Sequence, residues 1–182
     1  MMSHDHASCL GSSLRLSVWS AAQHGALCRL EELLGEDAAR ANKEDELRHT
    51  PLQLAALGGH LACVRLLLAR GAEPGACAAG YSALHRACVR GHAEVVEVLL
   101  AAPGGAAPAL LELRDTGTGD GRTPLAKAAA GGHAAVVSQL LAAGADARPV
   151  DARGLSARAL AEAAGHEEVV KLLPPDERFA SC

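Results

Sequence analysis

A glycine followed by a histidine recurs four times along this chain of 182 residues. The pairs end at His60, His92, His133 and His166, so successive histidines are 32, 41 and 33 residues apart. Self-similarity at a period of about 20–50 residues is typical of repeat architectures. This spacing constrains the fold more than any other feature, because each repeat must then be a small unit that stacks on the next one.

The segment before each Gly-His pair predicts a short helix. A hydroxyl residue that can cap a helix N-terminus stands about ten positions before each histidine (Thr50, Ser82, Thr123 and Ser156). Pro51 and Pro124 follow at the first helical position, where the missing N–H of proline costs nothing. The glycines that precede the histidines favour the left-handed conformation that ends a helix (Gly59, Gly91, Gly132 and Gly165).

The segment after each histidine predicts a second helix. Val96, Leu99 and Leu100 fall at positions i, i+3 and i+4 and so form one apolar stripe. Gly71 and Gly144 end two of these helices. A helix pair of this length cannot bury its apolar side alone, so neighbouring pairs must stack to form a continuous core.

The segments "HTPLQLAALGGH" and "RTPLAKAAAGGH", each followed by a valine–leucine helix, resemble the ankyrin repeat. A degenerate first copy is "SVWSAAQHGALCRLEELLGED". The resemblance implies an all-α ankyrin-repeat solenoid of about five helix-turn-helix repeats with hairpin finger loops. The expected repeats of the 17–173 domain are 17–44, 45–76, 77–117, 118–150 and 151–173, with a flexible N-terminal tail at 1–16 and a C-terminal tail at 174–182.

Two departures from the pattern carry expectations of their own. The long spacing between His92 and His133 places an insertion near 103–117, expected as a surface loop whose deletion over 105–112 leaves the fold intact. It is either neutral or a contact element. Arg158 and Glu162 stand where the repeats before them have apolar or small residues, which is typical of a polar C-terminal cap.

The repeated histidines raise the alternative of a metal or catalytic cluster. Equivalent side chains on adjacent packed helices are about 8–10 Å apart, whereas two histidines that share a zinc ion must each approach it to about 2.0–2.1 Å. We therefore expect each imidazole to bond the backbone near the turn and to start the second helix. His85, in "SALHRA", is expected to make a structural hydrogen bond to a turn.

Other candidate chemistry is weaker still. The N-terminal "HDHASC" offers metal ligands, but a flexible tail pays ordering entropy to use them. "GTGDG" at 117–121 lacks the third glycine of a phosphate loop, and Asp120-Gly121 favours a tight turn. Cys63 and Cys88 lie among apolar neighbours. We predict a protein that is not an enzyme and needs no cofactor and no metal.

Charge and composition limit the partners and the compartment. A net charge of −4 and a pI near 6.1 disfavour nucleic acid. No apolar run reaches the roughly 18–20 residues of a membrane span, so no membrane insertion is expected. Six cysteines without a CxxC pair and the lack of a secretory signal favour the cytoplasm or nucleus, with organelle or ciliary targeting as alternatives.

The resemblance implies a protein-binding function on the concave face, which is made by the finger tips and the exposed side of the first helices. Positions carried over to that face are Leu47, His49, Leu57, Tyr81, Val89, Arg90, Asp120, Arg122, Arg153 and Leu155. Tyrosine and arginine are enriched in binding hot spots, so the double substitution Tyr81→Ala with Arg122→Ala is expected to weaken binding without lowering thermal stability.

Two further expectations concern equivalent positions on adjacent repeats. Arg86 and Lys127 share one such position, so they form either a basic ladder toward an acidic partner or ordinary solvated charges. Trp19 is expected to pack against the second repeat. The function we predict is that of an adaptor or assembly subunit, monomeric on its own and bound to one or more proteins. The alternative is a stoichiometric inhibitor of a partner enzyme such as a protein kinase.

Overall fold

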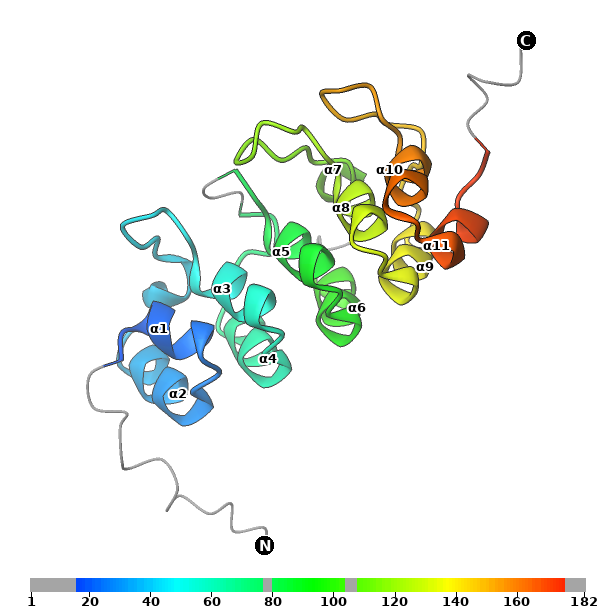
Figure 1. The fold of residues 1–182 in the computed structure, drawn as a ribbon. Helices are drawn as coiled ribbons and strands as arrows, with labels where there is room; N and C mark the ends of the chain where they lie inside the picture. Colours follow the sequence, from blue (N-terminus) through cyan, green and yellow to red (C-terminus); the bar gives the residue numbers. More distant parts are fainter. Residues whose placement is uncertain (1–15, 77–79, 104–107, 176–182) are drawn as a thin grey trace, which may run out of the picture.

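The computed structural model describes residues 16–76, 80–103 and 108–175, and these residues form helices and loops (Figure 1). Within the described ranges β-structure consists of isolated bridges, among them an antiparallel one between Val150 and Ser156. Most of the two predicted tails, 1–16 and 174–182, lies outside the described residues. No helix in these ranges has the length and apolar character needed to cross a membrane.

Five helix pairs follow one another along the chain and form a stack. The pairs are α1 (Val18–Gln23) with α2 (Leu27–Glu36), α3 (Pro51–Gly58) with α4 (Leu61–Ala69), α5 (Ala83–Arg90) with α6 (Ala93–Ala101), α8 (Pro124–Ala130) with α9 (Ala134–Ala142), and α10 (Ala157–Ala164) with α11 (Glu167–Leu172). A 3₁₀ helix, η3 (Ala38–Asn42), and a short helix, α7 (Pro108–Leu111), join these pairs. The predicted all-α solenoid of about five repeats is confirmed.

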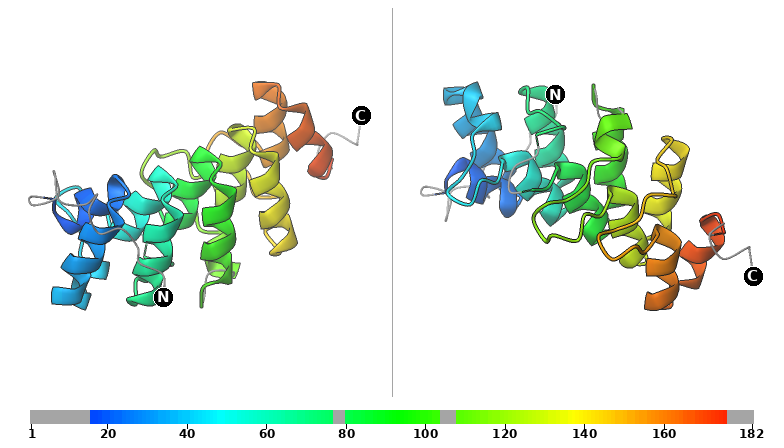
Figure 2. Two further views of the ribbon diagram at one scale, coloured as in Figure 1. Left: turned by 90° about the horizontal axis from the view of Figure 1, so that it is seen from below. Right: turned by 90° about the horizontal axis from the view of Figure 1, so that it is seen from above.

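The helices form two layers that run the length of the molecule (Figure 2). The first helices pack on one another in the order α1, α3, α5, α8 and α10, and the second helices do the same beside them. Leucine at the second position of the first helices (Leu52, Leu84 and Leu125) and valine in the second helices (Val64, Val96 and Val137) fill the core between the layers. Small alanines let the helices of the first layer approach closely.

The helix ends are stabilised as the sequence predicts. The hydroxyl oxygens of Thr50, Ser82, Thr123 and Ser156 each accept a hydrogen bond from the backbone N–H three residues later. Thr50 and Gln53 complete a reciprocal capping box. Gly59 and Gly91 end α3 and α5 at φ angles of 72° and 73°, where glycine is strongly favoured.

The repeated histidines connect neighbouring helix pairs. The Nε2 atoms of His60, His92, His133 and His166 lie 2.8–3.3 Å from backbone carbonyl oxygens of the preceding pair, those of Gln23, Leu57, Val89 and Ala130. A carbonyl oxygen can only accept, so Nε2 carries the proton in each of these histidines. The expectation that each ring bonds backbone near the turn and starts the second helix is confirmed.

The insertion does not behave as the predicted surface loop. It contains α7, whose Leu110 and Leu111 are 6% and 1% exposed and belong to the core. Deletion of 105–112 would therefore remove buried leucines, so the premise that the insertion lies outside the core is wrong and we no longer expect an intact fold. A helix of four residues is too short for its periodicity to be seen in the sequence, and the surrounding proline, glycine and alanine residues suggest a loop.

The last repeat ends in a polar network rather than in a bare apolar side. Arg158 donates from Nη1 to the carbonyl oxygens of Val170 and Leu173, at 3.0 and 2.9 Å. Its Nε pairs with Glu162 at 2.8 Å. Arg158 thus bonds the free carbonyls at the end of α11, which the last turn of a helix leaves without partners.

Candidate protein-binding surface

The face predicted to be concave and to bind partners consists of the first helices and four finger loops, at 43–50, 71–82 (of which 77–79 lie outside the described residues), 112–123 and 145–156 (Figure 1). Aspartates close the base of three of these fingers. Asp45 Oδ1 accepts from the backbone N–H groups of Leu47 and His49, and Asp151 Oδ1 accepts from those of Arg153 and Leu155. Asp115 Oδ1 accepts from the N–H of Arg122 in the third finger. These three fingers are therefore fixed by their own side chains.

The sequence reasoning did not single out these aspartates. The available signal was an aspartate at the same distance before the capping hydroxyl in two fingers, Asp45 before Thr50 and Asp151 before Ser156. Asp115 lies farther from Thr123 than the other two lie from their capping hydroxyls, so the pattern is masked in the third finger.

A second series of hydrogen bonds joins the first helices of the first three pairs, α1, α3 and α5, to the finger that follows each of them. Trp19 Nε1 donates to the carbonyl oxygen of Lys43 at 2.8 Å, and Gln53 Nε2 donates to that of Tyr81 at 2.6 Å. His85 Nε2 lies 3.2 Å from the carbonyl oxygen of Arg122. The predicted structural bond of His85 to a turn is confirmed. Trp19 bonds Lys43, which the predicted bounds place in the first repeat, and its helix α1 packs on α3 of the second repeat.

His85 is neutral in this arrangement. Its Nε2 donates to the backbone carbonyl oxygen of Arg122, so its Nδ1 carries no proton and accepts from the hydroxyl of Ser82 at 2.9 Å. Burial lowers the pKa of His85, and the neighbouring Lys127 lowers it further, whereas the backbone bonds and Asp115 act in the opposite direction. This side chain therefore positions the finger and is not exposed for proton transfer.

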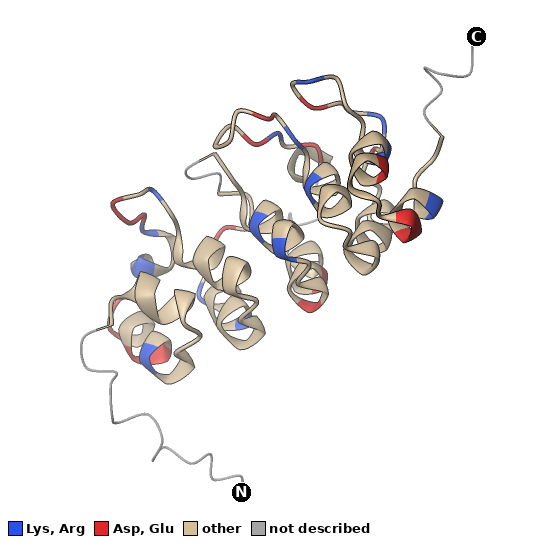
Figure 3. Ribbon diagram, in the orientation of Figure 1, with Lys and Arg blue, Asp and Glu red and all other residues tan. Residues whose placement is uncertain are grey.

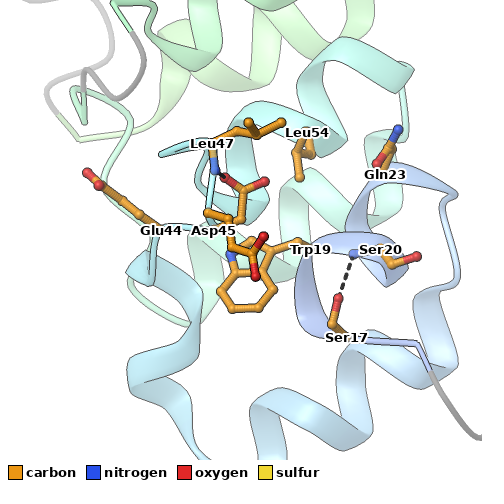
Figure 4. A pocket seen from close by; sticks show the side chains of 9 residues that line it. Ser17, Trp19, Ser20, Gln23, Glu44, Asp45, Leu47 and Leu54 are labelled. Carbon is orange, nitrogen blue, oxygen red and sulfur yellow. Dashed lines mark hydrogen bonds between the residues drawn. The ribbon is translucent and has the colours of Figure 1, made fainter.

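A groove of about 690 Å³ lies between the first finger and α1 (Figure 4). Leu47, at the tip of the finger, is 71% exposed, and Leu54 and Trp19 form the apolar floor. Glu44, Asp45 and Glu46 add three carboxylates to its lining. Glu44 pairs with Arg48 at 3.0 Å, and Asp45 is engaged inside the finger. The groove thus combines an exposed apolar side chain with an acidic rim.

Two basic residues, Arg86 and Arg90, lie on α5 in the middle of the stack, where Figure 3 shows basic positions on this helix. Arg86 stacks over the ring of Tyr81, with its Cζ 4.5 Å from the ring centroid. Arg90 is exposed one turn later, and Val89 beside it is 41% exposed. We call Tyr81, Arg86, Val89 and Arg90 the α5 patch. Among the described residues, neither arginine has a carboxylate within ion-pair distance.

Lys127 does not extend this patch as a second basic step. Its ammonium group pairs with the carboxylate of Asp115, whose side chain is fully buried, and Lys127 itself is 9% exposed. Burial alone would raise the pKa of Asp115, but hydrogen bonds from Lys127, from the N–H of Arg122 and from Thr118 hold it below its usual value. Neither alternative, a basic ladder or an ordinary solvated charge, holds for Lys127, because Asp115 of the third finger is its internal partner.

Arg122 is also held inside the protein. Its Nε lies 3.2 Å from Oδ2 of the buried Asp151, and only 13% of its side chain is exposed. Replacement of Arg122 by alanine would leave Asp151 without this partner. We therefore no longer expect Tyr81→Ala with Arg122→Ala to spare thermal stability, because the ion pair of Arg122 and Asp151 links two fingers.

The other predicted surface positions differ in exposure. Arg153 is exposed, with 63% of its side chain accessible, and Asp120 is about one-third accessible. His49 is half-buried, with Nδ1 3.4 Å from Asp45. Leu57 and Leu155 are half-buried as well, and Leu155 packs against the core. The exposed members of the predicted set are therefore Leu47, Val89, Arg90 and Arg153, with Arg86 half-exposed.

The described residues offer no group of three or more side chains that suits a metal ion. "HDHASC" lies outside the described residues. Cys63 and Cys88 are buried free thiols, and burial raises the pKa of both, which disfavours the reactive thiolate. Asp120 and Gly121 lie in the turn of the third finger, with Gly121 at φ 63°.

Comparison with known proteins gives one family. The model of ankyrin repeats (three copies) matches residues 18–109 and 100–179. The chain is 60% identical over 40 residues to "Ankyrin repeat and SOCS box protein 18" of Homo sapiens, over 22% of this chain and 9% of that protein. It is 44% identical over 59 residues to "Ankyrin repeat domain-containing protein 49" of Bos taurus, over 32% and 24%. "Inversin" of Gallus gallus is 35% identical over 101 residues, over 54% and 9%. The aligned segments thus span at most about a quarter of these relatives.

Proposed function

Because the chain belongs to the ankyrin-repeat family, we propose that it acts as a non-catalytic adaptor or assembly subunit that binds partner proteins through its concave face. Ankyrin repeats are protein–protein interaction modules, and the family is generally non-catalytic. Both the role of adaptor and the use of the concave face are part of this proposal. We expect the isolated chain to be a monomer.

The observation that carries the proposal is the exposed Leu47 above the groove beside α1. A leucine with 71% exposure at a finger tip is costly to leave in water, since the burial of a leucine side chain stabilises by about 1.5–3 kcal/mol. Asp45 fixes the backbone of this finger. A partner that covers Leu47 therefore gains apolar burial without ordering the loop, and a preorganised surface of this kind loses little entropy on binding.

The test compares two exposed leucines. Tagged wild-type chain, Leu47→Asp and Leu172→Asp are used to capture proteins, which are quantified by mass spectrometry and then purified for calorimetry. Leu172 is 43% exposed on α11, away from the fingers, so it is the matched control. We expect Leu47→Asp to weaken the affinity for a captured partner at least tenfold and Leu172→Asp to leave that affinity unchanged. Equal effects of the two substitutions would contradict binding at the concave face.

The same reagents separate an adaptor from an inhibitor. An adaptor must bring two purified proteins into one complex that does not form without the chain, whereas an inhibitor lowers the activity of a partner enzyme when added alone in equal amount. Light scattering of the purified chain tests whether it is a monomer in solution. The free thiols Cys63 and Cys88 support the cytoplasm or nucleus, where thiols stay reduced, and imaging of the tagged chain tests that compartment.

A further inference from the structure

The α5 patch contains two guanidinium groups that the described part of the protein leaves without a carboxylate. Arg86 is half-buried, and its planar group is held against the ring of Tyr81. Arg90, four residues later, lies on the same side of α5. Burial lowers the pKa of Arg86, although arginine stays charged at neutral pH. A charge that is partly removed from water usually has an ionic partner.

The equivalent positions in other repeats show that the patch is special to the third repeat. Leu54 and Leu160 occupy the place of Arg86 in the second and fifth repeats, and Lys127 occupies it in the fourth. Lys127 has the internal carboxylate of Asp115, but Arg86 has none among the described residues. Small residues, Gly58, Gly131 and Ala164, occupy the place of Arg90. Packing of the repeat therefore does not require a cation at either position.

We propose that the α5 patch binds an acidic segment of a partner protein, in which aspartate or glutamate carboxylates pair with Arg86 and Arg90 and an apolar side chain covers Val89. This inference rests on the proposed function and names the chemistry of the partner. A guanidinium held in place by stacking presents its N–H fork for bidentate contact with a carboxylate. The exposed Val89 lies between the two arginines in the sequence, so charged and apolar contacts fall on one short stretch.

The test uses a phage library of random peptides selected on the full chain. We expect the recovered peptides to be enriched in aspartate and glutamate. Their affinity, measured by fluorescence polarisation, should fall at least tenfold for the variant Arg86→Leu with Arg90→Ala. Both replacements copy residues that other repeats already carry at these places, which protects the fold. The matched control is Arg65→Leu with Arg70→Ala, which removes the same charge at α4.

Charge reversal makes the test sharper. The variant Arg86→Glu with Arg90→Glu should select peptides enriched in lysine and arginine, provided that thermal unfolding shows it to be folded. The inference is overturned if wild-type peptides have no acidic bias, or if acidic peptides bind the α5 variant and the α4 control equally. The inference is also overturned if a labelled oligonucleotide binds the wild type as tightly as the acidic peptides do and loses the same affinity in the α5 variant. Peptides that depend on Leu47 but not on the α5 patch would overturn the inference and leave the proposed function in place.

Discussion

The imidazole ring of His92 occupies the space that a side chain on Gly59 would need. A Cβ atom placed on Gly59 would lie 2.6 Å from Cε1 of this ring. Gly25, Gly91 and Gly132 stand in the same relationship to the histidine of the repeat that follows. Their Cβ positions would lie only 2.4–2.6 Å from the nearest ring atoms of His60, His133 and His166, respectively. The glycine is thus required twice, for its positive φ and for the neighbouring ring.

The last repeat allows these two requirements to be separated. Gly165 has a φ of 76°, close to the 72° of Gly59, but no described atom lies within 4 Å of its Cβ position. Gly165→Ala should cost about 1–2 kcal/mol, from the left-handed conformation alone. Gly59→Ala should cost about 1–3 kcal/mol more, because the ring of His92 must move. Urea unfolding measures both variants, and equal losses would show that the ring adapts freely.

Much of the fold can be predicted from the sequence because its signals are local and repeated. A capping hydroxyl such as Thr50 and a helix-ending glycine such as Gly59 act within one or two turns, and the repeat period shows which copies are equivalent. The contact of His92 with Leu57 follows from the same pattern, since equivalent residues on stacked repeats must meet equivalent neighbours.

Stability at mildly acidic pH should depend on His85. Burial lowers the pKa of the folded His85 below its ordinary value of about 6.5, so the unfolded chain takes up the proton first. The stability that His85 contributes is therefore present above about pH 6.5 and is lost as the pH falls below it. His85→Gln copies Gln53 of the second repeat, which makes the equivalent bonds and does not titrate.

We expect the free energy of unfolding of His85→Gln to lie within about 1 kcal/mol of that of the wild type at pH 8. It should lose less stability than the wild type between pH 7 and pH 5, as measured by urea unfolding at each pH. The exposed His24, replaced by glutamine, serves as the control. Parallel curves for the wild type and His85→Gln would show that the folded His85 binds protons as readily as the unfolded one.

The buried pair of Lys127 and Asp115 should be intolerant of the loss of one partner. Lys127→Leu leaves the fully buried carboxylate of Asp115 without its cation, at a cost of about 3–5 kcal/mol. Leucine itself suits the position, as Leu54 and Leu160 show. Addition of Asp115→Asn, which keeps an acceptor for the N–H of Arg122, should recover most of this loss in thermal unfolding. A double variant no more stable than Lys127→Leu would mean that packing, not charge, sets the cost.

The candidate site is less predictable than the fold because it depends on which side chains find partners. Arg86 and Lys127 are equivalent in sequence, yet among the described residues only Lys127 meets a carboxylate, because the third finger carries Asp115 where the second has Pro74. Arg122 likewise resembles a free finger residue until Asp151 of the next finger is placed beside it. Pairing across fingers is set by loop geometry, which the repeat pattern does not encode.

The insertion should contribute to stability through Leu111. This side chain is 1% exposed, and Leu111→Ala should cost about 2–5 kcal/mol through lost burial and the cavity left behind. Ala109, an exposed neighbour on α7, gives the control Ala109→Ser, for which we expect a change within about 0.5 kcal/mol. Calorimetric unfolding compares the two variants. A harmless Leu111→Ala would restore the view of the insertion as a dispensable loop.

The junction between the fourth and fifth repeats lacks the helix-to-finger bond that Gln53 makes, because Ala126 occupies that place. Arg114 of the insertion bridges the same junction, with Nη1 donating to the carbonyl oxygens of Gly121 and Val150 at 2.9 and 2.5 Å. We infer that the insertion replaces the missing bond. Arg114→Ala should therefore lower the melting temperature and speed amide hydrogen exchange in α10 and α11 before the earlier helices.

A second substitution at this junction tests the replacement directly. Ala126→Gln can complete a capping box with Thr123, as Gln53 does with Thr50, and can donate to the carbonyl oxygen of Leu155. In the Arg114→Ala background it should recover most of the lost melting temperature and restore slow exchange in α10. In the wild type its effect should be smaller, since the junction is already bridged. Equal effects in the two backgrounds would show that Arg114 and residue 126 act independently, because only sites that share one function are coupled in such a cycle.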